Sequence, residues 1–297
     1  MNRIKDQIRC GAAYRLGLTG KGIGVAVLDT GIFLHRDFDS RVTGFADMVN
    51  GKNFAYDDCG HGTHICGIIG GSGRMSGGRY SGIAPGCDLV MVKVLDRKGN
   101  GYSSDVLAGI SWILERKEKL GIRILNISVG ACSKRGMSEN SALVKGVNRA
   151  WDAGLVVVVA AGNNGPRTMS ITTPGISRKV ITVGCSDDDR EVLVGGNRMV
   201  DYSGRGPTAA CICKPDLVAP GCSVVSCAGR ADKYTIKSGT SMSTPIVSGA
   251  TALLLERYPD MTNKDVKLKL RESCRDIGLP RNQQGWGLLD VEKLVSK

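Results

Sequence analysis

The chain has 297 residues, of which 42% are hydrophobic and 23% charged, and its formal net charge is +12. This length suits one large α/β domain, and because no Pro-rich or low-complexity stretch could serve as a linker, we expect a single domain over 1–297. No run of 18 or more apolar residues occurs, which excludes an ordinary membrane-spanning helix. Lys and Arg are spread along the chain beside only four Phe, seven Tyr and three Trp. We therefore expect a solvated basic surface that favours acidic partners, with no nucleic-acid partner and no membrane partner.

The N-terminal residues contain no apolar stretch followed by a small-residue cleavage site, so they carry no signal for secretion. The eleven cysteines are an odd number and are scattered along the chain. In a chain without a secretion signal, such cysteines are expected to be reduced thiols. These observations predict a cytoplasmic protein.

Short apolar runs alternate with longer amphipathic runs along the chain. The apolar runs are typical of strands, several of them apolar on both faces: 22–29, 88–95, 122–129, 155–161, 179–184 and 222–228. The helical patterns are 103–121, 138–154, 241–257 and a helix that a capping box, Thr262 with Asp265, would open. This alternation predicts an α/β fold with a mostly parallel, doubly wound sheet flanked by helices.

Sheets of this kind bind their ligands in the loops that follow the carboxyl ends of the strands. Asp29 ends the first predicted strand, Ser128 lies at the end of the strand in 122–129, and Asn163 follows the strand in 155–161. These three positions are where we look first for function.

Asp29 is a lone carboxylate after the apolar run VAVL. Its burial at a strand end would cost several kcal/mol unless it found a partner, and an imidazole N–H is a suitable one. A structural turn aspartate explains the residue equally well.

The stretch CGHGTHICG, 59–67, places His61 and His64 three residues apart, on one face if the segment is helical. Structural histidines, a metal-binding pair and a general base are three competing interpretations. A zinc pair would need His35 or a carboxylate as a further ligand, and the Glu of the zincin pattern is missing.

The stretch SGTSMSTPIVSG, 238–249, precedes an apolar helical pattern. Pro245 fits that helix only in the first turn, which puts Ser241 at the helix N-terminus. Free N–H groups and the positive end of the helix dipole there would stabilise an oxyanion beside an attacking hydroxyl. An ordinary N-cap serine is the alternative.

Together these three stretches are more specific than any one of them. A serine hydroxyl becomes a nucleophile when a base takes its proton, and an imidazole base needs an acceptor that holds its tautomer. Asp29, His61 and Ser241 supply those three parts.

With these residues the chain resembles a subtilisin-like serine protease (subtilase), and the segment GSGRMSGGRYSGIAPG is similar to the bacterial intracellular branch. The resemblance extends from about residue 7 to 290. It rests on eight ordered motifs: DTG at 29–31, HGTH at 61–64, GIAP at 82–85, VKVL at 92–95, NISVG at 126–130, AAGN at 160–163, KPDLVAPG at 214–221 and GTSMSTP at 239–245.

The resemblance implies a serine endopeptidase that works through an acyl-enzyme, needs no cofactor for its chemistry, and serves intracellular proteolysis or processing of broad specificity. Asp29 would be the orienting acid, His61 the general base and acid, and Ser241 the nucleophile. Asn163 would donate to the oxyanion together with the backbone N–H of Ser241. A turn residue in GNNG is the alternative interpretation of Asn163.

The resemblance also implies a peptide or protein substrate that binds as an extended strand between two backbone segments. One segment would be Ser128, Val129 and Gly130, and the other Gly99, Asn100 and Gly101. The first side-chain pocket would have two walls, with Thr172 near its base. One wall would be 128–131, and the other would be Ala160, Ala161 and Gly162. Because family members often carry Gly at Ala131 and Thr172, the bulk there predicts that Leu or Met fits better than Phe or Tyr.

Metal sites and the control of activity are the less specific part of the resemblance. Structural calcium is an expectation, with Asp37 as the one clear remnant of a family calcium site. A metal cluster of Cys211, Cys213, Cys222 and Cys227 is an alternative, although its spacing matches no zinc knuckle or ribbon.

A separate propeptide or inhibitor would restrain the enzyme. Thr173–Pro174 matches a cis position of the family.

Two other classes of function compete with the endopeptidase. One is a catalytically silent relative used as a binding module, against which the four intact residues argue. The other is a metal-dependent hydrolase built on His61 and His64.

Overall fold

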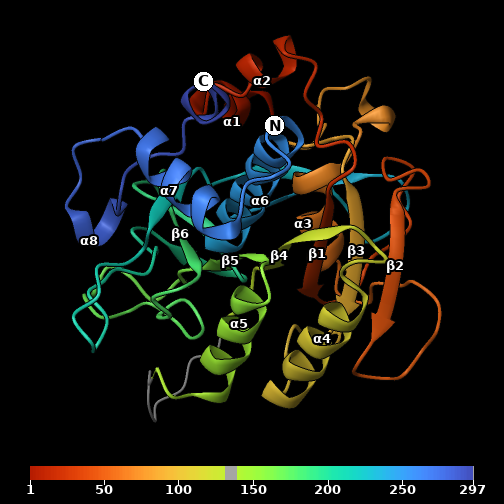
Figure 1. Cartoon of the computed structure of the whole chain (residues 1–297), viewed down its shortest axis with the longest axis horizontal. Helices are drawn as coiled ribbons and strands as arrows, with labels where there is room; N and C mark the ends of the chain where they lie inside the picture. The colour runs from red at the N-terminus through yellow and green to blue at the C-terminus, as the bar shows by residue number, and fades with distance from the viewer. Residues whose placement is uncertain (131–138, 297) are drawn as a thin grey trace.

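The centre of the fold is a seven-stranded sheet in which every neighbouring pair is parallel (Figure 1). The computed structural model describes residues 1–130 and 139–296. In order across the sheet the strands are β2 (Val42–Asp47), β3 (Asp88–Lys93), β1 (Gly24–Asp29), β4 (Ile122–Ile127), β5 (Val156–Ala160), β6 (Ile181–Cys185) and β9 (Leu217–Ala219). Every residue of β1, β5 and β6 is buried, as continuous apolar strands require in a sheet covered on both faces.

Helices cover both faces of this sheet (Figure 1). On one face lie α3 (His61–Gly70), α6 (Thr240–Arg257) and α7 (Asn263–Ser273), and on the other α4 (Ser103–Arg116) and α5 (Ala142–Asp152). Helix α6 is buried on nearly all sides and packs on β4, β5 and β6. The predicted doubly wound α/β fold is therefore confirmed.

Smaller elements surround the sheet. The predicted strand in 222–228 forms as β10 (Val224–Cys227), but it pairs antiparallel with β11 (Tyr234–Lys237) outside the main sheet. The other small elements are α1 (Asn2–Gln7), α2 (Gly11–Arg15), η1 (Arg74–Ser76), β7 (Val192–Val194), β8 (Asn197–Met199), α8 (Arg281–Gln284) and α9 (Val291–Val295). Among the described residues, no helix is both long and apolar enough to cross a bilayer.

The helix boundaries follow their capping residues. Ser141 caps α5 by accepting a hydrogen bond from the Val144 N–H, and the predicted capping box of Thr262 and Asp265 is present at α7. One prediction is wrong in detail, because α6 begins at Thr240 and Pro245 therefore lies in its second turn. Since proline has no N–H, the carbonyl of Ser241 lacks its usual helical partner.

One continuous core joins both ends of the described chain. Met1 and Ile4 near the N-terminus and Leu294 and Val295 near the C-terminus belong to the same cluster of buried apolar side chains as the central strands. The packed core therefore includes residues outside 7–290, the span over which the sequence resembles the subtilases.

The strand order creates a switch point between β1 and β4. These strands are neighbours, but the chain continues from β1 toward β3 and β2 on one side and from β4 toward β5 and β6 on the other. The loops that follow two such strands diverge and leave a crevice at their carboxyl ends. Asp29 ends β1 and Ser128 directly follows β4, so both lie at this crevice.

Candidate active site

Asp29 and His61 form a hydrogen-bonded pair at the carboxyl end of β1. The Asp29 side chain is fully buried, and the two atoms Oδ1 and Oδ2 lie 2.8 and 2.9 Å from His61 Nδ1. Oδ1 also accepts a 2.7 Å hydrogen bond from the Thr30 N–H. The carboxylate thus has the imidazole partner that its burial requires, and it holds Nδ1 as the protonated nitrogen.

The first turn of α3 fixes the position of His61. Gly62 donates its N–H to the Thr30 hydroxyl at 2.9 Å, and Asp57 accepts from the N–H of Thr63 at 2.9 Å. The Thr30 hydroxyl in turn donates to Asp57. The N–H groups of this helix end are therefore tied to Thr30, which directly follows Asp29, and to Asp57, which the Thr30 hydroxyl also contacts.

The charges around His61 set its protonation. Burial of the imidazole lowers its pKa, but the Asp29 carboxylate, through its charge and its hydrogen bond, raises the pKa by more. Lys237 lowers the pKa and Asp57 raises it. The net result is a pKa above the ordinary value, in a side chain that remains 22% exposed. A proton taken up by His61 is therefore stabilised.

His64 serves the fold. It is fully buried, and its Nε2 donates toward the carbonyl oxygens of Val224 in β10 and Thr235 in β11, at 3.1 and 3.2 Å. Burial, with the positive charge of Lys237 as the next cause, lowers its pKa to about 3. His64 is thus a neutral link to the hairpin, and Asp29 occupies the Nδ1 of His61, so the geometry gives no support to a metal-binding pair.

Ser241 lies at the N-terminus of α6, two residues after Gly239. Gly239 has a φ of 139°, in the region that favours glycine, and a Cβ there would lie 3.3 Å from Asn163 Nδ2. The Ser241 hydroxyl donates a 2.6 Å hydrogen bond to the carbonyl oxygen of Ser128. Among the described residues, no hydrogen bond joins this hydroxyl to His61, so the structure makes the first link of the predicted triad and leaves the second open.

Asn163 is anchored through its oxygen. Its Oδ1 accepts hydrogen bonds from both the N–H and the hydroxyl of Thr240, each at 3.0 Å. The Thr240 hydroxyl also accepts from the Gly162 N–H at 3.2 Å. Because the oxygen is held by these donors, the amide nitrogen points away from them as a donor.

The two predicted backbone segments line one cleft. It has a volume of about 220 Å³, and 99–101 lies on one side with Val129 and Gly130 on the other. Asp96 shapes the first side, because its carboxylate accepts from the N–H groups of Lys98 and Asn100. A chain laid between them would meet backbone on both sides.

Thr172 lies between the predicted pocket walls. A Cβ added at Gly130 or at Gly162 would collide with the Thr172 side chain, which is 4% exposed. Its hydroxyl donates to the carbonyl of Ala161 at 3.3 Å. Ala131, the other predicted bulky position, lies outside the described residues. Thr173–Pro174 is cis, as the resemblance implies.

A buried network that the sequence analysis did not single out links α6 to β4. Ser248 of α6 donates to Asn126 Oδ1, and Asn126 Nδ2 donates to the Ser128 hydroxyl, both at 2.9 Å. Asn126 belongs to the NISVG motif, and an amide inside an apolar strand is the signal that could have revealed it.

Lys93 is a second residue whose role the sequence analysis did not assign. Its fully buried ammonium donates to the carbonyl oxygens of Thr30 and Leu95 and pairs with Asp58 at 2.7 Å. It thereby holds the backbone that follows Asp29. The signal was a lysine inside the apolar strand motif VKVL.

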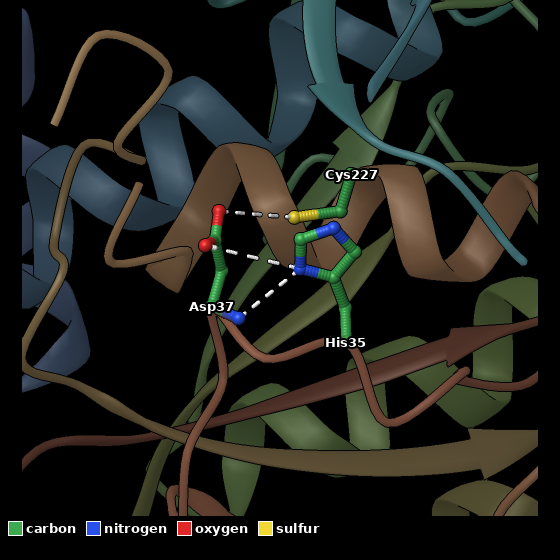
Figure 2. A group of neighbouring side chains, drawn as sticks. All are labelled: His35, Asp37 and Cys227. Carbon is green, nitrogen blue, oxygen red and sulfur yellow. Dashed lines mark hydrogen bonds and ion pairs between the residues drawn. The ribbon is translucent and has the colours of Figure 1, made fainter. Parts of the chain in front are cut away.

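Asp37, the predicted calcium remnant, lies in a buried cluster with His35 and Cys227 (Figure 2). Its Oδ1 accepts from the Met75 N–H at 2.9 Å, and its Oδ2 accepts from the hydroxyl of Tyr234 at 2.7 Å and from the Cys227 thiol. Burial and the charge of Asp37 raise the pKa of that thiol, which keeps it a donor. Calcium takes six to eight oxygen ligands. This nitrogen, sulfur and single-carboxylate set does not fit calcium, and calcium elsewhere stays a prediction.

The four cysteines considered as a metal cluster lie apart. Cys211 and Cys213 are exposed, whereas Cys222 and Cys227 are buried. Cys227 belongs to the Asp37 cluster and Cys222 to a different one, with Cys185 and Asp187. The described positions therefore do not support that cluster.

Comparisons with known proteins find similar sequences and a similar fold. A model described as "Subtilase family" matches residues 20–287. Serine protease AprX of Bacillus subtilis (strain 168) is 42% identical over 287 residues, which cover 91% of this chain and 64% of that protein, so the chain spans less than two thirds of its length. Subtilisin Savinase of Lederbergia lenta is 34% identical and is covered to 96%, with 97% of this chain aligned. The solved structure of Sphericase has a TM-score of 0.77 at 30% identity, covering 92% of this chain and 93% of its own.

The Asp37 cluster yields a test that separates hydrogen bonding from calcium binding. We expect Asp37→Asn to lower the thermal midpoint, because an amide cannot accept all the hydrogen bonds of a carboxylate, at a cost of about 1–3 kcal/mol. Any difference between midpoints measured with excess calcium and with chelator should be the same in the variant and the parent. Asp39→Asn, at an exposed position, is the matched control. Loss of a calcium-dependent difference in Asp37→Asn alone would show that Asp37 binds calcium.

Proposed function

Because this chain belongs to the subtilase family, we propose that it is a serine endopeptidase in which Ser241 attacks the peptide bond, His61 transfers the protons and Asp29 orients His61. The observation that carries the proposal is the contact of the buried Asp29 with His61, 2.8 Å between Oδ1 and Nδ1, at the crevice where the Ser241 hydroxyl donates to the Ser128 carbonyl. Substrate would be a peptide or protein chain laid in the cleft between 99–101 and 128–130.

The attack step needs one local rearrangement. The Ser241 hydroxyl donates to the Ser128 carbonyl, and it must turn to His61 Nε2 before its proton can leave. In the proposed extended binding mode, a backbone N–H of the substrate donates to the Ser128 carbonyl oxygen in place of the Ser241 hydroxyl. Binding of substrate would therefore release the hydroxyl for the base, and Asp29 would stabilise the imidazolium that results.

The oxyanion would lie between Asn163 and the start of α6. Attack of Oγ on the carbonyl carbon moves an electron pair onto the carbonyl oxygen, which needs donors already in place. The Asn163 amide, whose oxygen is held by Thr240, and the backbone N–H of Ser241 are those donors. The positive end of the α6 dipole adds to them.

Collapse of the tetrahedral intermediate returns the electron pair and breaks the bond to nitrogen. His61 gives its proton to the leaving amine, and an ester of Ser241 remains. Water, deprotonated by His61, then attacks the ester, and Oγ recovers its proton as the acid leaves. No cofactor enters these steps.

The biological setting is part of the same proposal. We place the enzyme in the bacterial cytoplasm, in proteolysis or processing of broad specificity, restrained by a separate propeptide or inhibitor. The ten described cysteines, all free thiols, support a reducing compartment. Cell fractionation followed by detection of the chain would test this location.

The oxyanion donor can be tested together with the residue that positions it. Using internally quenched peptides, we expect Asn163→Leu to lower kcat by about 10²–10³ with little change in KM, because the donor acts only on the transition state. Thr240→Val should lower kcat by about tenfold to a hundredfold, since it releases the Asn163 oxygen. Thr240→Ser keeps the hydroxyl and should restore most of the rate. An Asn163→Leu enzyme with unchanged kcat would refute the assigned role.

The pocket prediction concerns Thr172. With peptides that differ only in the residue before the scissile bond, the parent enzyme should prefer Leu or Met to Phe or Tyr, because Thr172 fills the space between Gly130 and Gly162. Thr172→Gly should raise kcat/KM for Phe and Tyr relative to Leu by about tenfold. A parent profile dominated by aromatic residues would contradict the prediction.

A further inference from the structure

A second cleft, larger than the one lined by 99–101, Val129 and Gly130, is lined by Gly60, the residue directly before His61. Its volume is about 670 Å³. One wall is formed by residues 57–60, which lead into α3, and the other by the turn of the β10–β11 hairpin and by β11, which ends at Lys237. Gly60 in one wall directly precedes His61, and Lys237 in the other lies four residues before Ser241. Lys237 is close enough to His61 for its charge to lower the pKa of that imidazole.

The direction of catalysis assigns this cleft to one part of the substrate. In the proposed mechanism, His61 gives its proton to the nitrogen of the leaving amine, so that nitrogen must lie beside His61. The residues before the scissile bond run along 128–130. The residues after it must therefore continue past His61, and the cleft that begins at Gly60 and Lys237 is open there.

The acidic side chains of this cleft already have partners. Asp57 accepts hydrogen bonds from the N–H groups of Gly60 and Thr63, and Asp58 pairs with the buried Lys93 at 2.7 Å. Asp232, next to the cleft in the hairpin turn, pairs with Arg36 at 3.1 Å.

The basic side chains of the cleft have no such partners. Arg230 and Lys233 are exposed and Lys237 is half-buried. Within the described part of the chain, none of the three forms an ion pair. The cleft therefore presents unpaired positive charge on one wall, where an incoming carboxylate would meet it.

We propose that this cleft binds the residues that follow the scissile bond and that Lys237, with Arg230 and Lys233, makes it prefer Asp or Glu there. The inference rests on the proposed function and names the substrate class of that site. Lys237 is the main determinant because it lies only four residues before Ser241, whereas the two exposed cations, further back in the hairpin, broaden the attraction along the substrate chain. Attraction of this kind weakens as salt screens it.

Charge reversal at Lys237 gives the sharpest test. The substrates are internally quenched peptides with Leu before the scissile bond and Asp, Ala or Lys in the two positions after it. We expect the parent enzyme to cleave the Asp peptides with kcat/KM about fivefold above the Lys peptides, and less so at high salt. Lys237→Glu should invert this order. A gain of activity on Lys peptides cannot come from misfolding, which would lower every rate.

Lys264 is an exposed lysine of α7, outside the cleft. The control variant Lys264→Glu makes the same change of charge and should cleave the peptides in the same order of preference as the parent enzyme. Hydrolysis at equal rates for all peptides, with no effect of Lys237→Glu, would overturn the inference while leaving the endopeptidase intact. Absence of hydrolysis of every peptide would overturn the proposed function itself, and the inference with it.

The pH profile supplies a second measurement on the same variants. The charged or titratable groups that act on His61 are Asp29, Asp57 and Lys237, with the neutral His64 behind it. Because His61 must be neutral to accept a proton, kcat/KM falls as the pH drops through its pKa. Lys237→Glu removes the one cation of this group, so the acid limb should move to higher pH. If the acid limb did not move, Lys237 would lie too far from His61 to influence substrate residues bound next to that imidazole, which would contradict its role as the main determinant.

Discussion

The buried contact between Asp29 and His61 is the constraint around which the site is organised. A fully buried carboxylate needs a partner, and the imidazole at the start of α3 supplies it at 2.8 Å. That contact requires α3 to begin beside the end of β1, which the Thr30 and Asp57 hydrogen bonds to the first turn of α3 enforce. It also sets the imidazole's tautomer, with the proton on Nδ1 and Nε2 left unprotonated.

The remaining groups reach the same crevice from elements far apart in the sequence. Because β1 and β4 diverge in their connections, the ends of both strands open toward the start of α6, where Ser241 touches the Ser128 carbonyl. The Thr240 hydroxyl joins α6 to the Gly162–Asn163 loop after β5. One helix N-terminus therefore meets the loops of two strands, so Ser241 and Asn163 are positioned by the same few hydrogen bonds.

The central strands, the long helices and the contact between Asp29 and His61 could be predicted, because hydrophobic periodicity indicates burial and the order of the motifs indicates which residues meet. The placement of a strand outside the main sheet, and the partners of buried polar side chains, could not be predicted. Strand β10 has the same apolar run as a strand of the main sheet, but it pairs with β11 instead. That pairing depends on residues far away in sequence, including His64, which donates toward a carbonyl oxygen in each of the two strands. The buried bonds of Lys93 and Asn126, and the protein donors that surround Asp37, are likewise set by tertiary contacts. No local sequence pattern predicts these contacts.

The central claim is that Ser241 is the nucleophile, and labelling of the purified chain with a fluorophosphonate tests it most directly. Intact mass should show one adduct per chain, peptide mapping should place it on Ser241, and Ser241→Ala should remain unlabelled while keeping the same circular dichroism spectrum and thermal midpoint. His61→Ala should slow labelling strongly, since the base that activates the hydroxyl is gone. A folded parent chain that takes no label, or a Ser241→Ala variant that is labelled as fast as the parent, would contradict the account.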